Sequence, residues 1–298
     1  MHHHVMEAVL GAAAALAVPV ALIGLAGEPA SGRDAAVTVE IPAAAIDYQL
    51  PGEFLADGRP AAAPSEVRAV DAFRIMKQQV SLADYGECVD DGACQPAAAR
   101  PGQVDVPVTG VNWLDAHAYA RWYSAATGQS WRLPTALELA VASAERFVGD
   151  SYSAIADDPS NPAIRWLRQY REEVAANRAP DPEPKRRGHF GSNSLGMDDF
   201  GGNVWEWTST CYERVTLDPV DGSVRGAIEN CGVYVMEGQH RTYMSSFVRD
   251  GKSGGCAVGT PPDHLGFRLV REEPAFIAKV KSALQRGLTS MFSGTGKG

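Results

Sequence analysis

The segment Asn193-Ser194-Leu195-Gly196-Met197-Asp198-Asp199-Phe200-Gly201-Gly202-Asn203-Val204-Trp205-Glu206-Trp207-Thr208 is the most informative part of this chain. Two of its carboxylates, Asp199 and Glu206, lie on either side of a Gly-Gly-Asn turn. Hard cations such as calcium bind several oxygens from carboxylates and backbone carbonyls, and a glycine-rich loop can turn its carbonyls inward. The tryptophans at 205 and 207 indicate that the loop is buried. The segment therefore predicts a structural calcium site, and the alternative is a solvated acidic loop.

Three other segments accompany it in a fixed order along the chain, together with a weaker opening at Phe73 to Val80. They are Pro107-Val108-Thr109-Gly110-Val111-Asn112-Trp113-Leu114-Asp115-Ala116-His117-Ala118-Tyr119, then Trp131-Arg132-Leu133-Pro134-Thr135 leading to Glu138, then Leu265-Gly266-Phe267-Arg268-Leu269-Val270. In this order the blocks resemble the signature blocks of the formylglycine-generating-enzyme (sulfatase-modifying factor) family. The resemblance implies an α+β fold of C-type-lectin-like architecture with little regular secondary structure, over about residues 67 to 271.

The resemblance also implies the ligands of the calcium ion. By similarity to the family's calcium loop, the side chains of Asp199 and Glu206 and the carbonyls of Gly202 and Val204 would bind it, while Asn203 shapes the turn. The ion would be structural. Two arginines in the other blocks, Arg132 and Arg268, stand beside apolar residues. For them we expect a buried ion pair or hydrogen bonds to loop carbonyls rather than a surface position.

The chain departs from the family pattern where the family's chemistry takes place. The family uses two cysteines in a segment of the form Gly-Ser-x-x-Cys-x-x-x-x-Cys, whose thiolates bind copper, a soft metal. The matching segment runs from Gly238 to Phe247 and has Thr242 and Phe247 at the two cysteine positions, with Gln239 in place of the serine. Copper binding and formylglycine generation are therefore not expected.

The cleft that contains the cysteine pair in the family still offers candidate residues for catalysis or binding in this chain. Cys256 follows Thr242 by 14 residues in a glycine-rich loop, so it could approach the cleft with His240 as a second ligand; alternatively it is a structural or unpaired thiol. Arg249 matches an arginine that follows the family's second cysteine, and the family residue that matches Trp205 lies near the reaction site. The full set of candidates is His240, Thr242, Tyr243, Phe247, Arg249, Cys256 and Trp205.

Composition and charge limit the class of protein. With 45% hydrophobic and 21% charged residues, the 298-residue chain has a globular composition. Its net charge of −9 comes with no basic stripe, so nucleic acid is not expected as a partner. Five cysteines allow two disulfides in 15 arrangements, and their spacing favours Cys88 with Cys94 and Cys211 with Cys231, which leaves Cys256 free.

The chain divides into four parts. Residues 1–27 contain an uncharged apolar run and predict a signal peptide or a membrane anchor, so we expect a periplasmic or otherwise extracytoplasmic protein, in contact with membrane only through this segment. Residues 28–66, rich in Ala, Pro and Gly, predict a linker with one edge strand near Val37 to Ile41. Residues 67–272 form the domain. Residues 273–298 predict an amphipathic tail helix that packs on the domain, extends into solvent or rests on membrane.

Local signals predict several elements within the domain. Phe73 to Val80 is typical of a strand, and Ser81 is placed to cap a helix over 82–89. Apolar spacing predicts a helix from Ala116 that ends at Gly128. Thr135 and Glu138 form the pattern of a capping box that begins another helix. Residues 150–190 predict a variable surface insertion, and residues 191–271 predict short strands and long loops.

Three functions follow from this pattern. The first is an accessory, maturation or ligand-binding protein for a protein, peptide or small molecule, comparable to exported members linked to pyoverdine maturation or encoded with copper nitrite reductases. The second is a metal-dependent oxidoreductase of altered chemistry that uses the same cleft. The third, a sugar-binding lectin, rests on fold analogy alone.

Overall fold

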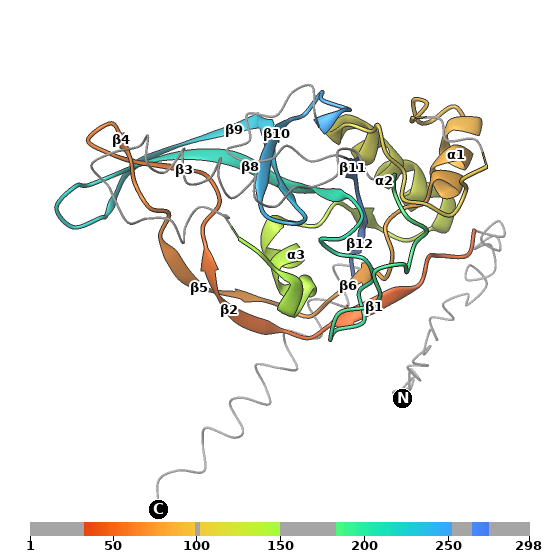
Figure 1. Cartoon of the computed structure of the whole chain (residues 1–298), viewed down its shortest axis with the longest axis horizontal. Helices are drawn as coiled ribbons and strands as arrows, with labels where there is room; N and C mark the ends of the chain where they lie inside the picture. The colour runs from red at the N-terminus through yellow and green to blue at the C-terminus, as the bar shows by residue number, and fades with distance from the viewer. Residues whose placement is uncertain (1–32, 99–101, 150–182, 252–263, 274–298) are drawn as a thin grey trace, which may run out of the picture.

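The computed structural model describes residues 33–98, 102–149, 183–251 and 264–273, and these form an α+β domain (Figure 1), as the sequence predicts. The predicted leader, the predicted tail helix, most of the predicted insertion and Cys256 lie outside the described residues. The helices are α1 (Leu82–Asp90), α2 (Trp113–Thr127) and α3 (Ala136–Ser143). The strands are β1 (Thr38–Ile41), β2 (Ala44–Gln49), β3 (Glu53–Ala56), β4 (Arg59–Pro60), β5 (Ser65–Val70), β6 (Phe73–Met76), β7 (Trp131–Arg132), β8 (Trp205–Leu217), β9 (Val224–Glu237), β10 (Thr242–Ser245), β11 (Leu265–Gly266) and β12 (Val270–Arg271).

Each of the three helices begins with a reciprocal capping box. The cap side chains of Ser81, Asn112 and Thr135 accept the backbone N–H three residues on, and the acidic side chain at that position accepts the N–H of the cap. Such pairs satisfy two of the backbone donors that a helix start leaves open. The cap at Asn112 starts α2 at Trp113, three residues before the predicted Ala116. The predicted stop holds, because Gly128 adopts φ 65°.

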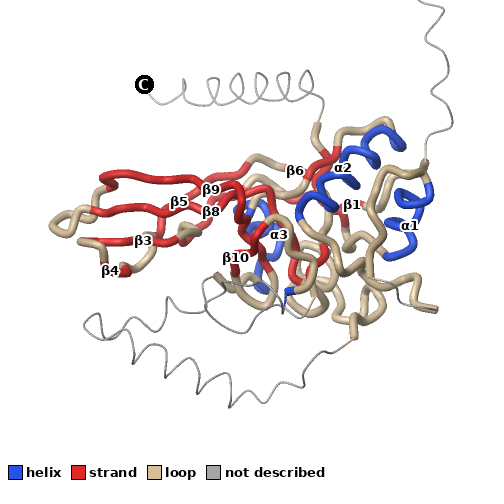
Figure 2. The backbone as a smooth tube through the Cα atoms, turned by 90° about the horizontal axis from the view of Figure 1, so that it is seen from above, coloured by secondary structure: helices blue, strands red, loops and turns tan. Residues whose placement is uncertain are grey.

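The strands form three sheets. The first has the order β1-β6-β12-β7, so strands from the two ends of the domain are neighbours. The second has the order β10-β9-β8-β3-β4, with β11 parallel to the start of β8, and the third pairs β2 with β5. Figure 2 shows the long strands of the second sheet extending away from α1 and α2. Predicted strand 73–80 is real but ends at Met76.

The predicted linker is wrong, because β1 to β4 and the start of β5 lie within residues 28–66 and belong to the fold. β1 pairs antiparallel with β6, and β3 pairs parallel with β8. Ile41, Tyr48 and Phe54 are buried. These strands are stabilised by partners far along the chain, and composition within the segment carries no information about such partners.

The prediction of short strands over 191–271 is also wrong for β8 and β9, which are 13 and 14 residues long. Register shifts interrupt their pairing, which is why the hydrophobic pattern is irregular. The predicted Cys211–Cys231 disulfide joins the two strands, and the predicted Cys88–Cys94 disulfide follows α1; both are confirmed. Within the described ranges, no helix combines the length and apolar character needed to cross a membrane.

Candidate functional site

Arg268 connects the start of β8 to the first sheet. Its Nε lies 2.6 Å from Glu206 Oε2 and its Nη2 lies 2.7 Å from Glu206 Oε1, and both side chains are fully buried. It also donates to the carbonyls of Met76, Lys77 and Asp198. The prediction of a buried ion pair with loop carbonyls is therefore confirmed for Arg268.

Arg132 occupies a more open position. It makes a two-bond pair with Glu138, with its Nη atoms 2.8 and 2.7 Å from the carboxylate oxygens, and its Nε contacts Glu272 at 2.9 Å. The Arg132 side chain is 36% exposed. It joins β7 to α3 at the edge of the core, so the ion pair is as predicted but the burial is partial.

Asp199 is fully buried and adopts φ 60°, a conformation that few non-glycine residues adopt. Its Oδ1 accepts the Phe190 N–H at 2.8 Å, and its Oδ2 accepts the Gly188 N–H. The Phe190 ring also packs against Gly202, where an added Cβ would lie 2.6 Å from the ring. Asp199 and Gly202 thus hold residues 188–190 against the turn that precedes β8.

These contacts bear on whether the predicted calcium ligands suit a calcium ion. A carboxylate oxygen can accept about two contacts. Both oxygens of Asp199 and Oε2 of Glu206 each accept one hydrogen bond, whereas Oε1 of Glu206 accepts two, from Arg268 and from Gln79 at 2.9 Å. Three of these four oxygens therefore have room for one further contact, and hard oxygen acceptors of this kind suit calcium. Arg268 already neutralises Glu206, so Asp199 would supply the charge that the ion needs.

The loop after β9 wraps around Trp205. The Trp205 Nε1 donates to the His240 carbonyl at 3.1 Å, and the two rings meet edge to face at 5.7 Å. A Cβ on Gly238 would lie 2.6 Å from the Trp205 indole, so the close approach requires glycine. This brings two predicted site residues, Trp205 and His240, into contact.

An open cleft of about 520 Å³ lies between this loop and residues 200–202. Five of its eight lining residues belong to the two sequence segments described above, but Arg146, Val148 and Phe190 belong to no motif. Arg146 is held there by the carbonyls of Phe190, Gly191 and Ser192. The lining residues are Arg146, Val148, Phe190, Phe200, Gly201, Gly202, Gly238 and Gln239.

The two positions of the lost cysteines differ in environment. Thr242 begins β10 opposite Met236 and is 2% exposed, and its Oγ1 has no hydrogen-bond partner among the described residues. Phe247 follows β10 and is 71% exposed. A hydroxyl and a phenyl ring do not supply the soft ligands that Cu(I) requires. The residues present therefore do not fit the family's copper site.

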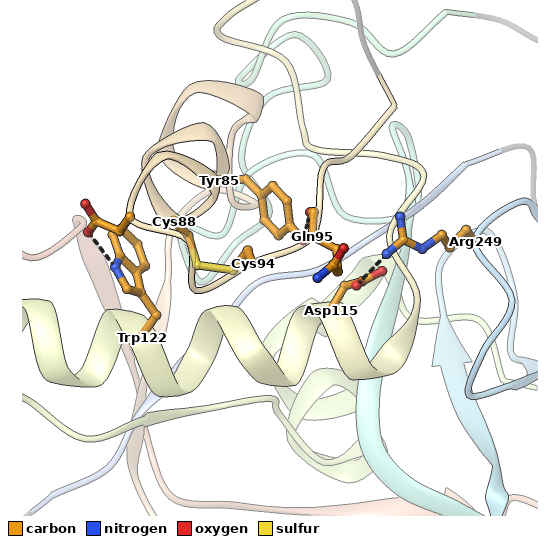
Figure 3. Close-up of a disulfide and its surroundings, with 8 residues drawn as sticks. Tyr85, Cys88, Cys94, Gln95, Asp115, Trp122 and Arg249 are labelled. Carbon is orange, nitrogen blue, oxygen red and sulfur yellow. Dashed lines mark hydrogen bonds and ion pairs between the residues drawn. A yellow bond between two sulfur atoms is a disulfide. The ribbon is translucent and has the colours of Figure 1, made fainter.

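The other candidates contact different parts of the fold. The Tyr243 hydroxyl accepts the Gly52 N–H at 2.7 Å, beside β3. Arg249 donates to Asp115 at 2.7 Å and to the Pro96 carbonyl at 2.9 Å, so it joins α2 to the loop of the Cys88–Cys94 disulfide (Figure 3). These contacts give Arg249 a structural position.

A second buried ion pair was not predicted. Arg241 Nε lies 2.9 Å from Glu237 Oε1, with both side chains fully buried, and the guanidinium carbon lies 4.9 Å from the centre of the Tyr48 ring. Burial lowers the pKa of Arg241, but the Glu237 carboxylate outweighs it and the net pKa is raised. Arg241 therefore stays charged. Its aromatic partner is almost two hundred positions away in sequence, so no local signal could have identified it.

Residues 30–273 match the family model described as sulfatase-modifying factor enzyme 1-like domain. The formylglycine-generating enzyme of Streptomyces coelicolor is 32% identical over 199 residues, 61% of this chain and 57% of that protein. The inactive C-alpha-formylglycine-generating enzyme 2 of Mus musculus is 28% identical over 136 residues, 42% of this chain and 39% of that protein. The chain thus spans little more than half, or less, of these relatives.

Among solved structures, PvdO from Pseudomonas aeruginosa superimposes with a TM-score of 0.47 and 19% sequence identity, and the match covers 79% of this chain and 94% of that one.

Proposed function

This chain belongs to the sulfatase-modifying factor enzyme 1-like domain family, and from that membership we propose that it is an exported accessory or ligand-binding member that does not generate formylglycine. The observation that carries the proposal is the pair Thr242 and Phe247 at the positions of the family's two cysteines. Neither side chain can become a thiolate, so neither can hold copper or exchange with a substrate thiol. The mouse relative that is named inactive supports the idea that this family includes proteins without the activity.

The test is a direct assay of the family reaction. The full chain is incubated with copper, oxygen and a cysteine-containing sulfatase peptide, and the peptide is analysed by mass spectrometry. The Streptomyces coelicolor enzyme serves as the positive control. We expect the peptide to remain unchanged with this chain, and formation of formylglycine would refute the proposal.

The compartment is part of the same proposal. Two disulfides within the described residues support an oxidising environment such as the periplasm or the cell exterior. In a cell-fractionation experiment we expect the chain outside the cytoplasm with both disulfides formed. Reduced chain confined to the cytoplasm would contradict this.

We also propose one structural calcium per chain, held by Asp199, Glu206 and the carbonyls of Gly202 and Val204. Elemental analysis of the full chain after buffer exchange without chelators measures calcium, copper and iron together. Calcium near one per chain without a redox metal would support the binding role. Stoichiometric copper or iron would instead favour the metal-dependent oxidoreductase, and substitution of His240 and Cys256 would then test its ligands.

A further inference from the structure

The outer edge of β9 is open over half of the strand. β10 covers this edge only from Val233 to Met236. From Val224 to Asn230 the strand pairs with β8 on its other side, and among the described residues no strand lies along the outer edge of this stretch or of Cys231. Every residue of this stretch is exposed, including Val224 at 62% and Ile228 at 70%.

Open edges of this kind pair readily with another strand, and proteins usually protect them with lysine, proline or a covering segment. The stretch Val224-Arg225-Gly226-Ala227-Ile228-Glu229-Asn230-Cys231 contains neither lysine nor proline. The Cys211–Cys231 disulfide joins β9 to β8 and holds the edge in an extended conformation. The edge is therefore preorganised for pairing.

The charges on the hairpin indicate what kind of strand would fit. Glu213 on β8 lies directly opposite Glu229 on β9, and like charges in this position destabilise a sheet. Arg225 lies four residues before Glu229, at a register shift where β8 offers it no opposite residue. Its side chain contacts Asp218 and is 55% exposed, so a further acceptor can approach it.

We propose that two copies of this chain pair through their open β9 edges, antiparallel and with Ala227 opposite Ala227. In this register Arg225 of each copy faces Glu229 of the other, which relieves the repulsion between Glu213 and Glu229. Ile228 of each copy lies opposite Gly226 of the other, which leaves room for its side chain. The edge is thus complementary to itself, as a two-fold interface requires.

Sedimentation velocity of the full chain over a concentration series tests this pairing. We expect a reversible dimer, since a single pair of strands buries less surface than a standard interface. Arg225→Glu should weaken dimerisation by about tenfold, because it replaces two favourable pairs with two unfavourable ones. Arg225→Glu combined with Glu229→Arg should restore it. Arg59→Glu, an equal charge change on exposed β4, is the matched control and should leave dimerisation unchanged.

Three results would overturn the proposal: a monomer at every concentration, a dimer that Arg225→Glu does not weaken, or a double variant that does not recover. Cross-linking between introduced cysteines tests the proposed register of the two strands. Ala227→Cys should form an intermolecular disulfide on mild oxidation, whereas Ala62→Cys, at an exposed position after β4, should not. Equal cross-linking of both variants would contradict the register.

Discussion

Arg268 matters for stability because its removal would leave the buried carboxylate of Glu206 without a charged partner. Its guanidinium neutralises the fully buried carboxylate of Glu206 and donates to carbonyls from two other segments. A buried ion pair adds little net stability, because desolvation of the charges offsets their attraction. Removing one partner is different, because an uncompensated charge then remains in the core.

Arg268→Met should therefore lower the free energy of unfolding by about 3–5 kcal/mol, measured by urea denaturation. Arg132→Met is the matched control. Because the pair of Arg132 with Glu138 is partly exposed, this substitution should lower the free energy of unfolding by only about 1 kcal/mol. Adding Glu206→Leu to Arg268→Met should recover part of the loss. Equal effects of the two arginine substitutions would contradict the importance of burial.

Gly238 offers a second prediction at this scale. An added methyl group would lie 2.6 Å from the buried Trp205 indole, so Gly238→Ala should destabilise the chain by about 1–3 kcal/mol through overpacking. Gly86→Ala, in α1, meets nothing within 4 Å and should stabilise it by up to about 1 kcal/mol. Thermal unfolding monitored by circular dichroism compares the two. A neutral Gly238→Ala would show that Trp205 can move.

At the residue scale, the sequence predicts the environment of a side chain when its neighbours in the chain determine that environment. Arg268 was expected to be buried because it stands among Gly266, Phe267 and Leu269. Arg241 and Glu237 were missed, because nothing near them indicates that Tyr48 and Phe147 will surround the guanidinium.

At the element scale, helix starts depend on local sequence, whereas strand lengths depend on partners far along the chain. The capping boxes at α1 and α3 span four residues each, so their starts could be predicted from sequence. The length of β8 and β9 could not, because their pairing depends on each other and on register shifts. Cysteine spacing was nevertheless sufficient to predict the disulfide that joins them.

That disulfide should stabilise the hairpin specifically. Cys211→Ala with Cys231→Ala should lower the free energy of unfolding by about 3 kcal/mol, as expected for a closed loop of this size. Hydrogen exchange should then become faster at the open part of β9. The control is Cys88→Ala with Cys94→Ala, which removes the disulfide that closes a shorter loop at α1. This variant should leave hydrogen exchange in β9 unchanged. Faster exchange in β9 in both variants would indicate global loosening instead.

At the scale of the whole molecule, the segment predicted as a linker supplies partners to both larger sheets. A chain that starts at residue 67 loses β1, which pairs with β6, and β3, which pairs with β8. It also loses the buried side chains of Ile41, Tyr48 and Phe54. We expect this truncated chain to show no cooperative thermal transition, in contrast to the full chain. A cooperative transition at the same temperature would restore the linker interpretation.

The order of strands in the first sheet has a consequence for biosynthesis. β12, at Val270–Arg271, lies between β6 and β7, which the ribosome completes much earlier. Such distant pairings make folding slow, because the chain must close large loops before the contacts form. The sheet therefore has a gap until residue 271 has been synthesised. Until then, β6 presents an open edge to chaperones, proteases and neighbouring nascent chains.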